Sequence, residues 1–251
     1  LNPWVGGRNS LLLRQGLGSV HFTGTIRAGS HAEEAAERAV VQTEVGGKLT
    51  LSGTLSTAKA RRLTFNPASG AFLEFAGSTS NVIWGRMLGG STANYIFNNS
   101  GTTTLIDTGN FSGGINSIYL ERGSLVITKD LSIASNIVQD IIDDNADFTV
   151  LRGATMRFNY DETVGSFATQ KGSDIRIQDS ATLTVDDNTN HVYGGGFSGE
   201  GNLVLSAVGG NAWHALLGAS SIGSGETSTV TIGATSSLTT VRVNALDNTS
   251  G

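Results

Sequence analysis

The chain has 251 residues, a formal net charge of −5, 34 glycines, 2 prolines and no cysteine. Without cysteine it cannot form a disulfide, a thiolate metal site or a cysteine nucleophile. The acidic balance and the lack of a basic stripe along the chain argue against a nucleic-acid partner. No run of about 18 apolar residues is present, so we expect no membrane span.

One phrase recurs along the chain: one or two glycines, a short run that alternates apolar and polar residues, and a turn rich in Gly, Ser, Asn or Thr. In chain order it occurs at 16–24 (GLGSVHFTG), 44–53 (EVGGKLTLSG), 123–128 (GSLVIT), 153–158 (GATMRF), 180–185 (SATLTV) and 199–207 (GEGNLVLSA). A phrase repeated tens of residues apart is typical of a solenoid. The spacing varies from about 20 to 35 residues, which indicates short strands with loops inserted on some coils.

Within each phrase the side chains have a period of two, as in a β-strand with one buried face. The apolar residues of the phrases are therefore expected to face inward and to stack between coils. They are Leu49, Leu51, Leu125, Ile127, Leu183, Val185, Leu203 and Leu205. His21 alternates with Val20 and Phe22 and is expected to point outward.

Two stretches interrupt this pattern and are predicted as short helical excursions. Residues 31–41 (HAEEAAERAVV) follow Ser30, a possible N-cap, and carry acidic residues in the first turn. Residues 135–144 (SNIVQDIIDD) place Ile and Val at helical spacing, although the same residues suit a strand. No linker separates the halves of the chain, so we predict one domain over 1–251: an all-β, right-handed parallel β-solenoid.

Three phrases resemble the autotransporter-associated β-strand repeat, in which glycines precede a short Thr-Leu-x-Leu strand that ends in Ser-Gly. Residues 16–24 match it at Gly16, Gly18, Val20, Phe22 and Gly24. Residues 47–53 match it from Gly to Gly, and 199–207 match it with Ala207 in place of the last glycine. The follow-on of the family's repeat, Asn-Thr-Tyr, is missing, and residues 211–213 (NAW) stand nearest to it. The resemblance implies a secreted or surface-exposed β-helix and carries no catalytic residues to this chain.

Catalytic motifs are sparse. Gly194, Gly196 and Gly199 spell G-x-G-x-x-G, but a dinucleotide site needs a helix after the glycines, and a strand pattern follows here. The alternative is a tight turn between coils. The four histidines form no metal-binding spacing, and no G-x-S-x-G elbow is present. We therefore expect no cofactor and no enzymatic activity.

Two acidic clusters are candidate carbohydrate-processing or Ca²⁺ sites, because β-helix enzymes use carboxylates on a groove. They are Asp140, Asp143, Asp144 and Asp147, and the pair Asp186 and Asp187. Runs of Asp and Asn are also ordinary turn formers. The aromatic residues could form a sugar-stacking strip or fill the coil interior; they include Trp4, Trp84, Trp213, Tyr95, Tyr119, Tyr160 and Tyr193.

The two ends of the chain carry the prediction about function. Strand edges exposed at the ends of a solenoid pair with other chains unless they are capped. We expect an assembly interface made by Trp4 and Val5 at one end and by Leu238, Val241 and Val243 at the other. The sequence thus predicts a non-enzymatic extracellular or bacterial cell-surface β-solenoid that assembles head to tail, with a surface polysaccharide as a possible partner. The alternatives are a polysaccharide lyase or hydrolase and a carbohydrate-binding module.

Overall fold

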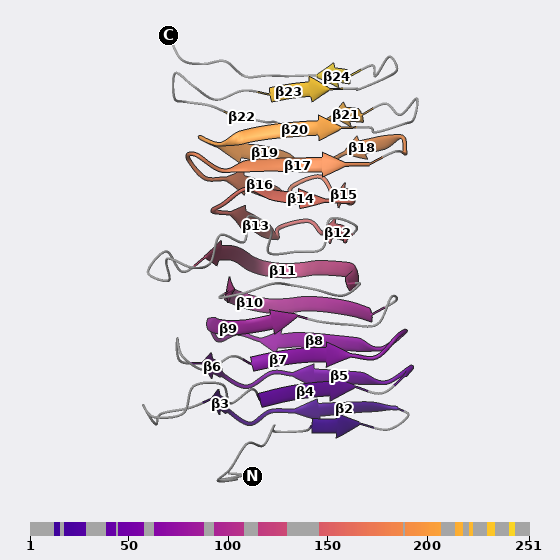
Figure 1. The fold of residues 1–251 in the computed structure, drawn as a ribbon, viewed down its shortest axis with the longest axis vertical. Coiled ribbons are helices and arrows are strands. Elements are labelled where there is room, and N and C mark those ends of the chain that lie inside the picture. Colours follow the sequence, from indigo (N-terminus) through magenta and orange to yellow (C-terminus); the bar gives the residue numbers. More distant parts are fainter. Residues whose placement is uncertain are drawn as a thin grey trace.

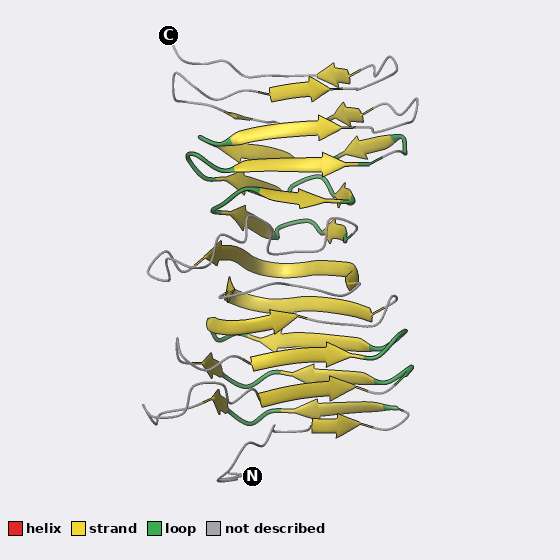
Figure 2. Ribbon diagram, in the orientation of Figure 1, coloured by secondary structure: helices red, strands yellow, loops and turns green. Residues whose placement is uncertain are grey.

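Parallel strands stack along the long axis of the molecule and form a β-solenoid, as the computed structural model shows (Figure 1). Strand β2 lies near one end of the rod and β23 and β24 lie at the other. The described residues are 13–15, 18–28, 39–43, 45–57, 63–87, 93–107, 115–129, 146–187, 189–206, 214–217, 221–222, 230–233 and 241–243. Every regular element among them is a strand (Figure 2). Within this part of the chain, no helix has the length and apolar character needed to cross a bilayer.

The strands form three stacks, and one circuit through the three stacks makes a coil. The first stack runs unbroken along the rod. It holds β2 (Ser19–Phe22), β5 (Lys48–Leu51), β8 (Phe72–Gly77), the first parts of β10 (Ala93–Asp107) and β11 (Ile115–Lys129), β12 (Asp147–Val150), β15 (Ser166–Thr169), β18 (His191–Tyr193), β21 (His214–Leu216) and β24 (Val241–Val243).

The second stack follows the first around the corner of each coil. It holds β3 (Ile26–Ala28), β6 (Leu55–Thr57), the first part of β9 (Asn81–Met87), the second parts of β10 and β11, β13 (Thr155–Phe158), β16 (Asp174–Ile177), β19 (Gly196–Gly199) and β22 (Ser221–Ile222). Because β10 and β11 belong to both stacks, they bend around this corner.

The third stack is described in two parts. One part holds β1 (Leu13–Gln15), β4 (Ala39–Thr43), β7 (Leu63–Pro67) and the end of β9. The other part is a four-stranded sheet of β14 (Glu162–Val164), β17 (Thr182–Asp186), β20 (Asn202–Ser206) and β23 (Val230–Gly233).

Strand pairing places equivalent residues of successive coils directly beside one another. One inward column of the first stack runs through Phe22, Leu51, Phe75, Phe97, Leu120, Val150, Thr169, Tyr193, Leu216 and Val243. The closest neighbours in this column, Val150 and Thr169, are 19 residues apart in the chain, and the most distant, Leu120 and Val150, are 30 apart. The coils are therefore as irregular in length as the phrase spacing predicts.

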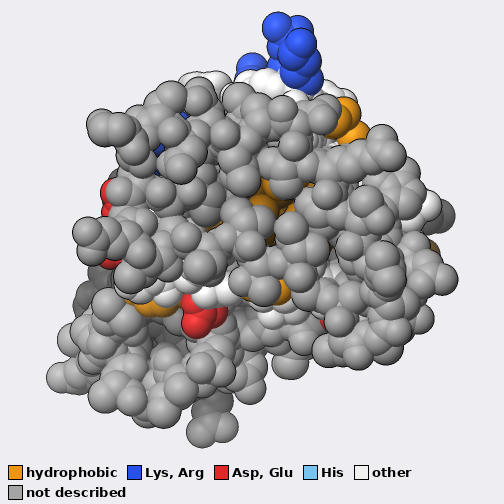
Figure 3. All heavy atoms as spheres, turned by 90° about the horizontal axis from the view of Figure 1, so that it is seen from above, with side chains coloured by type: hydrophobic (Ala, Val, Ile, Leu, Met, Phe, Trp, Pro, Cys, Tyr) orange, Lys and Arg blue, Asp and Glu red, His pale blue; other side chains and the backbone are white. Residues whose placement is uncertain are grey.

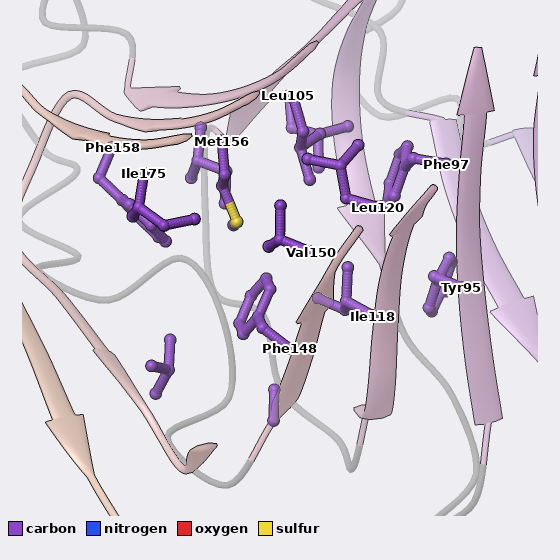
Figure 4. Close-up of a cluster of buried hydrophobic side chains, with 14 of the residues drawn as sticks. Tyr95, Phe97, Leu105, Ile118, Leu120, Phe148, Val150, Met156, Phe158 and Ile175 are labelled. Carbon is purple, nitrogen blue, oxygen red and sulfur yellow. The ribbon is translucent and has the colours of Figure 1, made fainter. Parts of the chain in front are cut away.

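The predicted core is confirmed. All eight phrase residues expected to face inward are at most 2% exposed, and they form one apolar cluster with the aromatic side chains. Phe75 stacks on Phe97 with ring centroids 5.0 Å apart, and Phe148 stacks on Phe167 at 5.1 Å. Figure 4 shows Phe148, Val150 and Ile118 from successive coils pointing into the same interior. Parallel stacking thus places apolar groups on apolar groups.

The predicted helix over 31–41 is wrong at its C-terminal end. Ala39, Val40 and Val41 belong to β4, which pairs in parallel with β1 on one side and β7 on the other. The β-branched valines suit a strand better than the last turn of a helix. Residues 31–38, and the whole of the predicted helix over 135–144, lie outside the described residues.

Glycine at one corner of the coil is required by the distance between coils. A Cβ added to Gly53 would come within 1.8 Å of the carbonyl oxygen of Gly24 on the preceding coil. Real Cβ atoms do not approach a backbone atom this closely, so any other residue at this position would force the two coils apart.

The inward assignment predicts a sharp contrast between neighbouring residues of β20. Leu203 is fully buried, whereas Val204 faces the outer side and is only half-buried. We expect Leu203→Asp to lower the free energy of unfolding by about 3–5 kcal/mol, because it buries a charge between coils. Val204→Asp, the matched control, should change it by less than about 1 kcal/mol. Urea denaturation followed by circular dichroism measures both changes. Equal free energies of unfolding for Leu203→Asp and wild type would contradict the inward assignment.

Candidate functional site

The first coil leaves its inward side chains uncovered. Strand β2 has a single neighbour among the described strands, β5, and pairs Val20 with Leu49 and Phe22 with Leu51. The two leucines are 2% and 1% exposed, yet Val20 is 48% exposed and Phe22 is only partly buried. Val20 and Phe22 therefore continue the inward columns of the core to an apolar surface at this end of the rod.

The other end of the rod carries an open strand edge. Strand β24 pairs with β21, which places Val241 beside His214 and Val243 beside Leu216. Leu216, the register partner of Val243, is 1% exposed. In the described part of the chain no strand pairs with the other edge of β24. A strand edge without a partner presents backbone N–H and C=O groups that a further strand can pair with.

The predicted assembly residues divide accordingly. Val241 and Val243 lie in β24, the last described strand of the first stack, and their part in an interface stays a prediction. Trp4, Val5 and Leu238 lie outside the described residues. Sequence reasoning missed Val20 and Phe22 as end residues. Their alternation with His21 in 16–24 was a signal for inward-facing side chains, but not for their exposure.

The acidic pair after β17 forms a turn. Asp187 is 5% exposed, and its Oδ1 accepts hydrogen bonds from Thr189 N at 2.8 Å and Thr189 Oγ1 at 2.7 Å. Such contacts two residues ahead are those of an Asx turn. The other oxygen lies 2.9 Å from His191 Nδ1, although the two atoms are not aligned for a hydrogen bond. Asp186 lies beside Ser206 in the register of β17 and β20.

The surroundings of this turn are closed and apolar. Burial and the nearby Asp187 carboxylate raise the pKa of Tyr193, so its phenol stays protonated. The His191 and Tyr193 rings lie 5.3 Å apart, and Tyr193 is fully buried. The arrangement can orient the His191 ring and close the turn. No group of three or more potential metal ligands occurs among the described residues. Asp140, Asp143 and Asp144 lie outside them, and the remaining acid of that cluster, Asp147, accepts a hydrogen bond from Ser166.

The structure also locates the glycine motif and two of the tyrosines. Gly194 lies between β18 and β19, Gly196 and Gly199 lie in β19, and strand β20 follows. The strand after the glycines excludes the strand–loop–helix geometry of a dinucleotide site. Gly194 lies at the corner between β18 and β19 of one coil, whereas Gly196 and Gly199 are strand residues, so the motif as a whole is not a turn between coils. Tyr95 and Tyr193 are buried in the core rather than displayed on the surface. Trp4 and Trp213 lie outside the described residues. His21 points outward as predicted, with Nε2 2.6 Å from Ser52 Oγ.

Polar side chains on the outer side of the first stack are joined between coils around Glu74. Its carboxylate lies 2.8 Å from Lys48 Nζ and accepts hydrogen bonds from Thr50 Oγ1 at 2.8 Å and Asn98 Nδ2 at 3.2 Å. Burial raises the pKa of Glu74, but the hydrogen bonds and charge of these partners outweigh it and leave the pKa below its ordinary value of 4.5. Glu74 thus ties together the coils of β5, β8 and β10.

Comparison of the chain with protein-family models, with curated proteins and with solved structures finds no match. The resemblance to the autotransporter-associated repeat therefore stays a prediction from the sequence phrases.

The Glu74 contacts predict a pH-dependent contribution to stability. Because the pKa of Glu74 is lower in the folded than in the unfolded chain, the contribution is present above about pH 4.5 and is lost as the pH falls through the folded-state value. At pH 7, Glu74→Gln should lower the free energy of unfolding by about 1 kcal/mol. The difference from wild type should shrink in urea titrations below pH 4.5. The control is Glu121→Gln, which removes a glutamate without an ion pair among the described residues; an equal loss there would contradict the assignment.

Proposed function

We propose that this chain is a non-enzymatic, structural β-solenoid of the bacterial cell surface or the extracellular space, which assembles head to tail into a filament or forms part of a secreted passenger. The observation that carries the proposal is the uncovered apolar end of the first coil, where Val20 is 48% exposed although its register partner Leu49 is 2% exposed. An added β-strand covers these side chains and pairs with the backbone edge beside them at the same time.

A second copy of the chain has the strand that fits. If β2 of one copy is added to the free edge of β24 of another, in the parallel direction of the first stack, Phe22 comes beside Val243 and Val20 beside Val241. Both pairs continue the inward columns that run through each copy. The two contacting surfaces differ, so the contact does not close on itself. A non-closing heterologous contact produces a fibre.

The extracellular location rests on the sequence. The chain has no cysteine, as suits a passenger that crosses an oxidising periplasm unfolded, and its phrases resemble a repeat of secreted β-helices. A surface polysaccharide is the second expected partner, bound along the side of the rod.

The enzyme alternative requires two carboxylates that can reach a sugar. Asp187 Oδ1 instead accepts hydrogen bonds from the backbone N–H and the hydroxyl of Thr189, which supports the structural role. We expect no release of unsaturated or reducing sugars when the protein is incubated with acidic polysaccharides. Turnover that disappears in Asp186→Asn or Asp187→Asn would establish the enzyme in place of the structural element.

Three valines of similar exposure allow a sharp test of assembly. Val20, Val82 and Val192 are 48%, 44% and 45% exposed, but only Val20 stands in an inward column at an end of the rod. We expect wild type to form fibres under the electron microscope and Val20→Asp to remain monomeric in sedimentation velocity. Val192→Asp, with the same charge change on the side of the rod, should assemble like wild type.

Circular dichroism of each variant shows whether it is folded. Deleting residues 1–7 tests separately the sequence prediction that Trp4 and Val5 take part in the interface; if they do, the truncated chain should remain a folded monomer. Wild type that stays monomeric at high concentration, or assembly of Val20→Asp equal to that of Val192→Asp, would contradict the proposed contact.

A further inference from the structure

Three cationic residues stack at one corner of the solenoid. Arg122, Arg152 and Lys171 lie between the first and second stacks on three successive coils. Strand pairing fixes their alignment on both sides of the corner. The column Leu120, Val150 and Thr169 precedes them, and the column Ser124, Thr155 and Asp174 follows them. We call these three residues the cation ladder.

The backbone holds the three rungs in equivalent places. Each cation comes directly before a glycine with positive φ: 78° at Gly123, 81° at Gly153 and 87° at Gly172. The last two turns are closed by hydrogen bonds, from Ala154 N to Leu151 O at 3.1 Å and from Ser173 N to Gln170 O at 3.0 Å. Gly153 N donates to Gly172 O at 2.9 Å and ties these two turns together. Adjacent rungs of a parallel stack are about 4.8 Å apart, so the charges form a line along the rod axis.

The charge of the ladder is not neutralised by its neighbours. All three residues are exposed, and no carboxylate among the described residues forms an ion pair with any of them. The nearest acid on the following strand, Asp174, is held by Arg176 at 2.6 Å and by Ser198 at 2.8 Å. Arg122 donates from Nη2 to the carbonyl of Asn98, which positions the guanidinium without removing its charge.

A hollow open to solvent lies against this part of the ladder, lined by Arg152, Gln170, Lys171 and Gly172. A Cβ on Gly172 would lie 3.4 Å from Arg152 Cγ, so the glycine leaves space for the arginine stem. In the view down the rod, a group of cationic side chains projects from one side of the molecule (Figure 3). Like charges stacked at rung spacing repel one another, and an anionic ligand relieves the repulsion.

We propose that the cation ladder binds a linear, carboxylated polysaccharide that lies along the rod axis, with successive carboxylates on successive rungs. The ladder is one residue wide and is set in a chain of net charge −5, so it suits a single extended polymer better than a broad nucleic-acid duplex. The Gln170 amide lies beside Arg152 and Lys171 and can form hydrogen bonds with sugar hydroxyls. This proposal names the glycan class for the surface role proposed above and rests on that role for its biological setting. The ladder itself lies on the side of the rod, apart from the ends.

The test is binding of the full chain to immobilised polygalacturonate by biolayer interferometry at several salt concentrations. We expect binding that weakens with salt, and no binding to fully methyl-esterified polygalacturonate, which lacks the charge. Arg152→Gln should weaken binding roughly fivefold and lower the slope of log K against log salt by about one. Arg152→Lys should retain most of the affinity. The triple variant Arg122→Gln, Arg152→Gln, Lys171→Gln should lose measurable binding.

Lys48→Gln is the matched control, because it also removes one positive charge but lies outside the ladder; its affinity should change less than twofold. Equal loss in Lys48→Gln and Arg152→Gln, equal binding of the esterified polymer, or tighter binding of single-stranded oligothymidylate than of polygalacturonate would overturn the proposal. Assembly of the triple variant separates the two proposals. If its fibres form normally while glycan binding is lost, both hold. If wild type binds the glycan without forming fibres, only the head-to-tail contact fails.

Discussion

The structure depends on one constraint: in a parallel solenoid each residue lies directly beside the equivalent residue of the next coil, at the strand spacing of about 4.8 Å that backbone hydrogen bonds impose. Each side chain must therefore pack well against the side chains at the equivalent positions of the coils above and below it. In the interior this is met by columns of Leu, Ile, Val and Phe, with Phe75 on Phe97 and Phe148 on Phe167 nearly parallel. At the corner of Gly53 it is met by having no side chain, because the preceding coil occupies the space.

The same constraint makes the outer surface informative about function. Around Glu74, neighbouring coils contribute complementary groups, Lys48, Thr50 and Asn98, and the result is a contact that stabilises the stack. In the cation ladder, neighbouring coils contribute like charges, which weakens the stack slightly. The cation ladder lies at an exposed corner, its charges repel one another, and no described carboxylate pairs with them. A ligand therefore explains this column better than a contribution to stability does.

The sequence was sufficient for the period-two pattern and hence for the fold class and the core, because alternation and glycine turns are local properties. It was not sufficient for features created by stacking. Arg122 and Arg152 are 30 residues apart and Arg152 and Lys171 are 19 apart, so a basic line on the surface leaves no basic run in the chain. Because the coils differ in length, residues that lie side by side on neighbouring coils cannot be identified from their spacing in the sequence. The charged residues before Ala39–Val41 favour a helix in the sequence, although the two valines favour a strand. Pairing with β1 and β7 makes this segment a strand in the structure.

The ends and the side of the rod have different physical requirements, and this allows the two proposed interactions to coexist. The proposed end contact needs apolar columns and unpaired backbone groups, and among the described strands it uses β2 and β24. The ladder needs exposed cations on adjacent coils and leaves both ends free. A filament built through the ends would repeat the ladder once per subunit, and a long polyanion would then engage several ladders at once. Binding of the second and later ladders is intramolecular, so a contact that is weak in one subunit becomes strong in the assembly. If both proposals hold, assembly would increase the avidity for the glycan, and single subunits would release it readily.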